Sequence, residues 1–318
     1  MSTLARLGRR LAPAGGLIAG YVLDRLLGDP QRRHPVAGFG LLAGRLEQRL
    51  YADDRRAGIA FATVSVGAPI IAAAAVGRAT RRWPLLTGVL TAATTWAVLG
   101  GRSLVHEAEA VADHLGVEDL TAARSQVARL VGRDTAELDE SEIARAAVES
   151  VAENSSDAVV APLLWGAVAG VPGLVGYRAV NTLDAMVGHR TAQYERFGWA
   201  TARLDDLANW LPARVSASLA ALGAPWVGGS PKEAAAIVLR DASAHPSPNA
   251  GVVEAAYAGA LGVRLGGRNT YQGQVSDRGT LGDGRPPQGG DIARATRLAT
   301  MVGDAALVVA VVVRLARA

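Results

Sequence analysis

The chain contains no cysteine and a single lysine, Lys232, so arginine carries nearly all of its positive charge. The absence of cysteine excludes disulfides, thiolate metal sites and a cysteine nucleophile. Charged residues make up 19% of the 318 residues, which is below the roughly 25% of an ordinary soluble domain. The arginines are scattered without a Lys/Arg-rich run, so the sequence predicts no nucleic-acid partner.

Two frequent phosphate and metal motifs are also missing. The chain has neither a Gly-x-x-x-x-Gly-Lys-Ser/Thr loop nor a His-Glu-x-x-His zinc motif. It shows no internal repeat and no strand-like alternation of polar and apolar residues of any length. The sequence therefore predicts an all-α fold.

Small apolar residues are what the chain has in abundance. Half of it is hydrophobic, only 5% is aromatic, and the mean hydropathy is +0.18. Two uncharged runs, 57–77 and 83–101, are bounded by arginines and are long enough to cross a bilayer, which takes about 20 apolar residues. They predict a helical hairpin in the membrane. The alternative is a buried helical pair in a soluble bundle.

We therefore interpret residues 1–318 as one integral membrane domain, a polytopic helical protein with polar helical and loop segments between its spans. Further membrane segments are predicted near 11–27, 158–177, 215–229 and 299–313. Pro162, Gly170 and Pro172 predict that the second of these is kinked or re-entrant. The Gly- and Pro-rich stretch 262–291 is predicted to be a loop.

Three carboxylates lie at helical spacing just before the run at 158–177. Glu149, Glu153 and Asp157 stand at i, i+4 and i+8, which places them on one stripe of a helix, with Asn154 beside them. Like charges at this spacing repel unless something neutralises them. The stripe predicts a bound Mg²⁺ or a cationic partner. The alternative is a solvated face paired with Arg145.

Other polar groups flank the apolar runs. One group comes early in the chain and surrounds the helix-ending sequence Gly28-Asp29-Pro30, where simple turn chemistry is an equal explanation. The next groups follow the run at 158–177, where Asp205 and Asn209 share a helix face and Asp206 points elsewhere; helix capping is the alternative for each Asp. These candidates are Asp24, Asp29, His34, Asn181, Asp184, Arg190, Asp205, Asp206, Asn209 and Arg214.

The most unusual stretch runs from Arg240 to Glu254. Two prolines between His245 and Asn249 make a rigid, non-helical turn. The helix predicted to follow would offer free backbone N–H groups to a substrate phosphate, with Ser247 or Asn249 as its cap. His245 could orient or protonate a substrate, although a buried structural histidine is as good an explanation.

Five of these segments, in this order, resemble the adenosylcobinamide-phosphate synthase family of cobalamin biosynthesis. They read Leu-Asp-x-x-x-Gly-Asp-Pro with His-Pro-Val, Glu-Ser-x-x-Glu-Asn-x-x-Asp, Asn-Thr-x-Asp-x-Met-x-Gly, Asp-Asp-x-x-Asn-x-x-Pro-Ala-Arg, and Asp-Ala-x-x-His-x-Ser-Pro-Asn-x-Gly-x-x-Glu. Each is weak alone, and together they cover the chain from about Asp24 to Asp291. With this resemblance we predict catalytic roles for Glu149, Glu153, Asp184 and His245, and metal binding by Glu149, Glu153, Asp157, Asp205 and Asp206. Substrate or phosphate binding is predicted for Asp24, Asp29, His34, Asn154, Asn181, Arg190, Arg214, Arg240, Ser247, Asn249 and Glu254.

The resemblance implies a multi-pass protein of the bacterial cytoplasmic membrane. It implies an ATP- and Mg²⁺-dependent reaction that joins adenosylcobyric acid, as an amide, to aminopropanol phosphate or a related amino-alcohol phosphate. Other late enzymes of the pathway and the lipid bilayer are the expected partners. Thr191 and Ala192 stand where the family usually has Asn-Glu, and His189 stands where Tyr is more usual, which puts activity and substrate in doubt. A transporter or a non-catalytic subunit of a corrinoid assembly complex are the alternatives.

Overall fold

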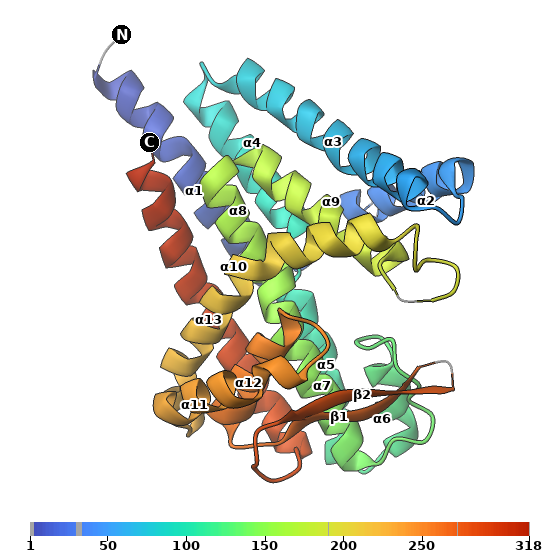
Figure 1. Ribbon diagram of the computed structural model, residues 1–318. Coiled ribbons are helices and arrows are strands. Elements are labelled where there is room, and N and C mark those ends of the chain that lie inside the picture. The colour runs from blue at the N-terminus through green and yellow to red at the C-terminus, as the bar shows by residue number, and fades with distance from the viewer. Residues whose placement is uncertain (1–2, 30–33, 190, 272, 318) are drawn as a thin grey trace. The chain divides into compact units, whose positions relative to one another are not determined.

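The computed structural model describes residues 3–29, 34–189, 191–271 and 273–317 (Figure 1). The chain separates into two compact units. Unit 1 contains Met1–Gly100, Ala161–Asn209 and Leu307–Ala318, and unit 2 contains Gly101–Val160 and Trp210–Ala306.

Unit 1 is made of helices. They are α1 (Thr3–Leu27), α2 (Pro35–Leu50), α3 (Arg55–Thr80), α4 (Pro84–Val98), α8 (Ala161–Ala169), α9 (Val171–Val187), the beginning of α10 (Trp199–Gly223) and the end of α13 (Gly289–Ala316). One buried cluster in this unit joins α2, α3 and α9, and its members are Ala43, Phe61, Leu183, Val187 and Phe197.

Glycines allow α1 and α4 to approach closely. A Cβ added to Gly16 would lie 2.6 Å from the Cβ of Thr91, and one added to Gly20 would lie 2.4 Å from the Cβ of Thr95. Any larger residue at either glycine would force the two helices apart. This Gly-x-x-x-Gly spacing on one face of α1 is typical of helix pairs in membranes, where close backbone contact replaces the hydrophobic effect.

Unit 2 combines helices with one β-hairpin. Its elements are α5 (Gly101–Gly116), α6 (Leu120–Val127), α7 (Glu140–Ser155), the π-helical turn η1 (Ser156–Val160), the 3-10 turns η2 (Ala224–Val227) and η3 (Ala242–Ala244), α11 (Pro231–Asp241), α12 (Ala250–Leu261), β1 (Leu265–Tyr271), β2 (Gln274–Leu281), the end of α10 and most of α13. The short apolar helix α12 is buried almost throughout. Its Tyr257 is fully buried, and the hydroxyl donates a 3.0 Å hydrogen bond to Ser155 Oγ on α7.

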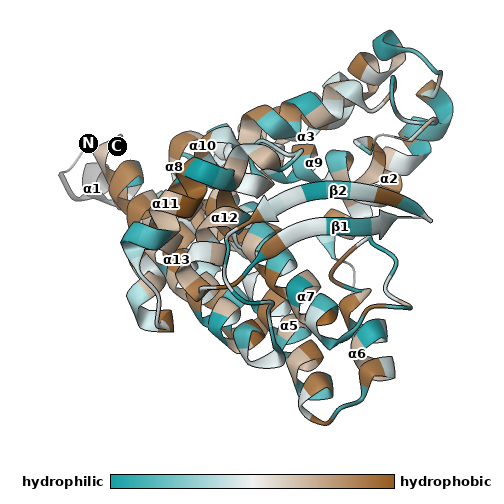
Figure 2. Cartoon of the chain, turned by 60° about the horizontal axis from the view of Figure 1, so that its bottom comes forward, coloured by the Kyte–Doolittle hydropathy of each residue, from teal (hydrophilic) through white to brown (hydrophobic). Residues whose placement is uncertain are grey.

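The hairpin corrects the prediction of a loop at 262–291. Strands β1 and β2 pair antiparallel, with a bulge between Gly266 and Arg268. Only Leu265, Gly266, Asn269 and Leu281 of the two strands are buried, so the alternation of apolar residues that signals a strand is absent. The hairpin is hydrophilic or intermediate in hydropathy over most of its length, whereas α8 and much of α13 are hydrophobic (Figure 2).

Three helical segments of the described chain are long and apolar enough to cross a membrane, by length and composition: Arg55–Thr80, Pro84–Gly116 and Gly289–Ala316. The second covers α4 and α5. Large apolar side chains such as Ile71 (70% exposed) and Leu85 (83% exposed) point outward, as lipid contact requires. The predicted class, an all-α polytopic membrane protein, is confirmed. The predicted kink in 158–177 is confirmed too, because the chain breaks at Gly170, between α8 and α9.

Candidate active site

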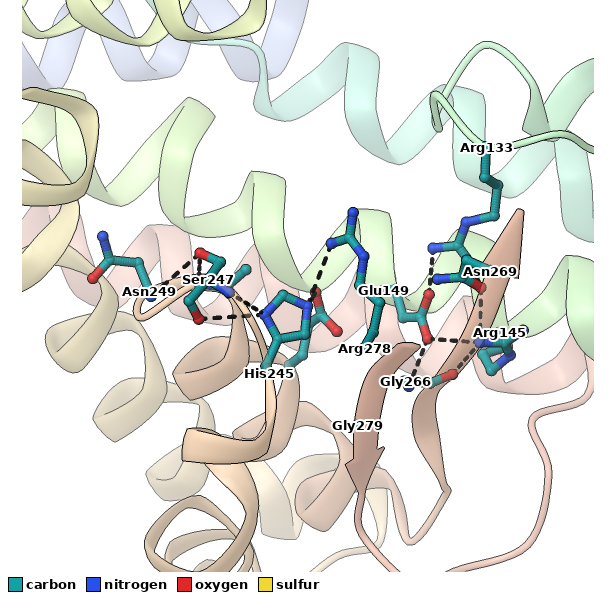
Figure 3. A network of polar contacts seen from close by, with 12 residues as sticks. Arg133, Arg145, Glu149, His245, Ser247, Asn249, Gly266, Asn269, Arg278 and Gly279 are labelled. Carbon is teal, nitrogen blue, oxygen red and sulfur yellow. Dashed lines mark hydrogen bonds and ion pairs between the residues drawn. The ribbon is translucent and has the colours of Figure 1, made fainter. Parts of the chain in front are cut away.

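Glu149 is the centre of a buried polar network in unit 2 (Figure 3). It lies on α7, and its Oε1 accepts a 2.7 Å hydrogen bond from the Gly266 N–H of β1. Arg133 donates to Oε2, and Arg145, one helical turn earlier, lies 3.5 Å from Oε1. The Oδ1 of Asn269 accepts a hydrogen bond from each arginine, at 3.0 and 3.1 Å. Glu149 therefore pairs with two guanidinium groups and ties the hairpin to α7.

These contacts occupy both oxygens of Glu149. The side chain is 5% exposed, so the alternative of a solvated face is wrong at this position, although the pairing with Arg145 is present. A Mg²⁺ ion bound to Glu149 would have to displace protein donors from it. The catalytic and metal-binding roles of Glu149 stay predictions, and the contacts of Glu149 favour a structural role.

His245 and Glu254 form a second buried pair in the same unit. The His245 side chain has no exposed surface, and its Nε2 lies 3.8 Å from Glu254 Oε1 and 3.3 Å from Nη1 of Arg278. The Nδ1 atom lies 3.0 Å from the N and 3.3 Å from the O of Ser247. The Ser247 N–H donates to Nδ1, and the Arg278 guanidinium, which can only donate, lies next to Nε2, so each ring nitrogen faces a donor although a neutral imidazole has one acceptor nitrogen.

Burial raises the pKa values of the carboxyl groups near His245 and lowers the pKa of His245 itself. Desolvation, together with the negative charges of Glu149 and Glu153, holds the pKa of Glu254 well above its usual range. The pKa of Glu153 is raised by its own burial and by Glu149, against the opposing charge of Arg278. Burial lowers the pKa of His245, so its ring is neutral at neutral pH. A neutral imidazole beside carboxyl groups that hold protons tightly is an arrangement suited to proton transfer.

The predicted stripe of Glu149, Glu153 and Asp157 does not continue along one α-helix. Helix α7 ends at Ser155, and Asp157 lies in the π-helical turn η1. A π-turn holds more residues than an α-turn, so Asp157 departs from the α-helical spacing of the other two. Asn154 donates to the carbonyl oxygen of Ser150 at 2.9 Å and to its hydroxyl at 3.2 Å.

The prediction of free N–H groups at the start of α12 is wrong. The hydroxyl of Ser247 accepts from the N–H groups of Asn249 (3.4 Å) and Ala250 (3.1 Å). The N–H of Gly251 donates to the Ser247 carbonyl, and that of Val252 donates to the Asn249 carbonyl. The turn therefore satisfies its own helix, and a phosphate there would compete with these bonds.

Unit 1 holds a separate polar group on α9 and α10. The Tyr177 hydroxyl donates to Asn209 Oδ1 at 2.8 Å, and Asn209 Nδ2 donates to Asp205 Oδ2 at 3.0 Å. Burial and the nearby charge of Asp184 raise the pKa of Asp205 to about 7, against hydrogen bonds from Asn209 and Asn181. The structure thus brings together residues of two sequence motifs. Both aspartates of the second motif lie inside α10, so helix capping does not explain them.

The prediction that Asp205 and Asp206 point in different directions is confirmed. Asp206 lies 3.5 Å from Arg203 Nη1, on a different part of the helix surface from the Asp205–Asn209 pair. Asp24 is fully buried in α1. His34 caps α2 by accepting a 3.1 Å hydrogen bond from the Val36 N–H.

The predicted anion-binding arginines have partners within the chain. Arg214 donates to Asn249 Oδ1 at 2.6 Å. Arg240 forms ion pairs with Asp241 at 2.7 Å and Asp283 at 3.0 Å, at an exposed position. Asp29 is half-buried at the end of α1, and Arg190 lies outside the described residues.

No group of three or more His, Asp or Glu side chains able to hold a metal ion occurs in the described parts of the chain. Mg²⁺ usually keeps several waters and binds one or two carboxylates together with substrate phosphates, so a closed protein cage is not required. Asp205 offers the best fit, because its Oδ1 is buried and has no hydrogen-bond partner.

Sequence reasoning missed the residues that the hairpin contributes. Gly266, Asn269 and Arg278 come from a stretch predicted to be a loop, and Arg133 comes from the segment before α7. Paired glycines at 266 and 267, both with positive φ, were the signal for a bulge.

Comparison with known proteins identifies a family and several relatives of this chain. The family described as "CobD/Cbib protein" matches residues 17–299. A protein named "Cobalamin biosynthesis protein CobD" from Mycobacterium tuberculosis is 51% identical over 94% of this chain and 95% of its own length. Proteins of the same name from Geobacter metallireducens and Rhodobacter capsulatus are 46% and 43% identical, over 87% and 90% of this chain and 89% and 92% of their own.

No solved structure matches the chain. The family match covers the Glu149 network, the His245–Glu254 pair and the Asp205 group. With relatives this similar over nearly the full length, this chain belongs to the CobD/Cbib protein family of cobalamin biosynthesis.

Proposed function

We propose that this chain is an adenosylcobinamide-phosphate synthase, a ligase that joins the propionate carboxylate of adenosylcobyric acid to the amine of aminopropanol phosphate or a related amino-alcohol phosphate. The observation that carries the proposal is the buried His245–Glu254 pair next to Arg278, in a chain of a cobalamin-biosynthesis family. The remaining features of the site are consistent with the chemical demands of such a step.

Amide formation from a carboxylate needs an activated acyl group. A phosphoryl group transferred from ATP to the carboxylate gives an acyl phosphate and ADP. Attack by the amine then forms the C–N bond and releases inorganic phosphate. Electrostatic stabilisation of the phosphoryl oxygens is the main requirement of the first half of this sequence.

The second half needs a proton acceptor, because an alkyl ammonium group cannot attack until it loses a proton. His245 supports this role, since burial keeps its ring neutral and Nε2 faces the interior of the site. Glu254 Oε1 lies 3.8 Å from Nε2, where a carboxyl oxygen can accept a hydrogen bond from the imidazolium that results. Glu153 is half-buried one helical turn after Glu149 and is a further candidate for proton transfer.

Mg²⁺ would supply charge neutralisation for the phosphates of ATP. The oxygens of Asp184, Asp205 and Asn181 are hard donors of the kind that Mg²⁺ prefers, and the buried, unpartnered Oδ1 of Asp205 supports their use. Asp205 and Asp184 are the first candidates for a Mg²⁺ site within unit 1.

The proposed cellular setting rests on the apolar helices and on the proposed reaction. We propose a multi-pass location in the bacterial cytoplasmic membrane, with ATP supplied from the cytoplasm, and association with other late enzymes of the pathway. The three helical segments long enough to span support the membrane part.

Purified protein in detergent or nanodiscs tests the activity. Adenosylcobyric acid, aminopropanol phosphate, ATP and Mg²⁺ should yield the amide with one ADP for each product, and omission of either co-substrate should stop ATP consumption. His245→Gln should lower kcat with little change in the KM values. Corrinoid uptake into vesicles without product would favour a transporter, and absence of ATP consumption would favour a non-catalytic subunit.

A further inference from the structure

Arg278 lies in the site beside His245 and outside the ion pairs that hold the Glu149 network together. It projects from β2 toward His245, and its Nη1 lies 3.3 Å from His245 Nε2 (Figure 3). Its guanidinium carbon is 5.2 Å from the centroid of the Tyr271 ring. Within the described ranges Arg278 forms no ion pair with a carboxylate, and its buried Nε has no hydrogen-bond partner.

The carboxylate at the centre of the neighbouring network is not available to Arg278. Glu149 is already bonded to Arg133 and Arg145. Arg278 faces a neutral imidazole, and its Nε–H has no hydrogen-bond partner among the described residues. Its guanidinium group can therefore bind an anion from outside the protein.

The fold holds Arg278 in place through its neighbour Gly279. Gly279 has φ of +69°, and a Cβ added to it would lie 2.6 Å from the carbonyl oxygen of Ala244. The strand therefore packs directly against the turn that carries His245. Asp277 Oδ1 accepts a 2.9 Å hydrogen bond from the Gly279 N–H. These contacts fix the spacing between Arg278 and His245.

We propose that Arg278 binds the phosphate of the amino-alcohol phosphate and thereby directs its amine toward His245. The proposal rests on the function proposed above and deepens it by assigning the substrate's anionic end. Guanidinium groups bind phosphate through two parallel N–H donors. When Arg278 turns to the phosphate, Nε2 of His245 loses its present donor and becomes available to the amine. The assignment replaces the start of α12 as the phosphate site.

Kinetics of Arg278→Ala and Arg278→Lys test the assignment. Arg268→Ala is the matched control, because Arg268 lies exposed on the paired strand of the same hairpin. Loss of a charge-assisted hydrogen bond predicts that Arg278→Ala raises the KM for aminopropanol phosphate about 10- to 100-fold, with partial recovery in Arg278→Lys. The preference for aminopropanol phosphate over unphosphorylated aminopropanol should fall by the same factor. The KM values for ATP and adenosylcobyric acid should stay within about twofold of wild type.

Calorimetry can measure the binding of aminopropanol phosphate in the absence of ATP and corrinoid. It tests the Arg278 site independently of the proposed ligase activity. Binding by the wild type and the Arg268→Ala control, but not by Arg278→Ala, supports the site even if no product forms. A product-forming enzyme whose Arg278→Ala variant keeps its KM values overturns the site and leaves the function standing. A KM increase confined to ATP or to the corrinoid also overturns it, because the bound anion is then a different one. Arg278→Lys, which keeps the charge and the stem, covers the case in which Arg278→Ala fails to fold.

Discussion

Replacing Glu149 with glutamine would test how the hairpin is held to α7. The substitution keeps the size of the side chain and an oxygen that can accept from the Gly266 N–H. It removes the negative charge that lies beside both Arg133 and Arg145. The two guanidinium groups would then be buried together without a counter-charge.

The size of the effect follows from the burial of the pair. The side chains of Arg133 and Glu149 are 7% and 5% exposed, and loss of one partner from a buried ion pair costs about 3–5 kcal/mol. Asn269 Oδ1 continues to accept from both arginines. We therefore expect Glu149→Gln to lower the free energy of unfolding by about 3 kcal/mol, at the lower end of that range.

Chemical unfolding in mild detergent, with limited proteolysis of the hairpin at 265–281, measures this loss. Glu140→Gln is the matched control, because Glu140 is exposed on the same helix, and its change should stay within about 0.5 kcal/mol. Adding Arg133→Met to Glu149→Gln should recover part of the stability, since it removes one uncompensated charge. Equal stability of Glu149→Gln and Glu140→Gln would refute the structural role and return Glu149 to the list of metal-ligand candidates.

Three further outcomes are expected. Glu153→Gln should lower turnover at least tenfold while leaving the free energy of unfolding at pH 7 unchanged or higher, because burial already disfavours the charged carboxylate; near-normal kcat would exclude Glu153 from the reaction. The pKa of Asp205 rises from 3.8 to about 7, so between those pH values the folded protein holds a proton that the unfolded chain has lost, and stability should fall as pH rises through this window and level off above it. The full shift corresponds to at most about 4 kcal/mol, and Asp205→Asn should flatten the profile measured by unfolding in detergent; an unchanged slope would contradict the shift. Finally, the protein should remain with membranes after high-salt washing and require detergent for release, as the apolar helices predict, and recovery as a soluble monomer would contradict the fold class.

The sequence by itself determined the helical class, the long apolar helices and the family. Uncharged runs bounded by arginine are a local property that needs no knowledge of tertiary contacts, and residues 57–77 lie within α3 as predicted. The break within 158–177 was equally local, since Gly170 and the proline after it cannot continue a regular helix. Helical spacing alone predicted that Asp205 and Asn209 share one face of the helix.

Only the tertiary structure decided what the polar residues contact. In the stripe that suggested a cation, Glu149 is paired with Arg133, sixteen residues away in sequence, and accepts a hydrogen bond from a backbone N–H of a strand 117 residues further on. Sequence spacing can show that a charge needs a partner, but it cannot tell a metal ion from a distant arginine. The hairpin stayed hidden because polar bonds, rather than an apolar face, hold it in place. Arg278 contacts His245 because Gly279, which has no side chain, lets β2 approach the turn that carries Ala244 and His245. This contact depends on the folded backbone.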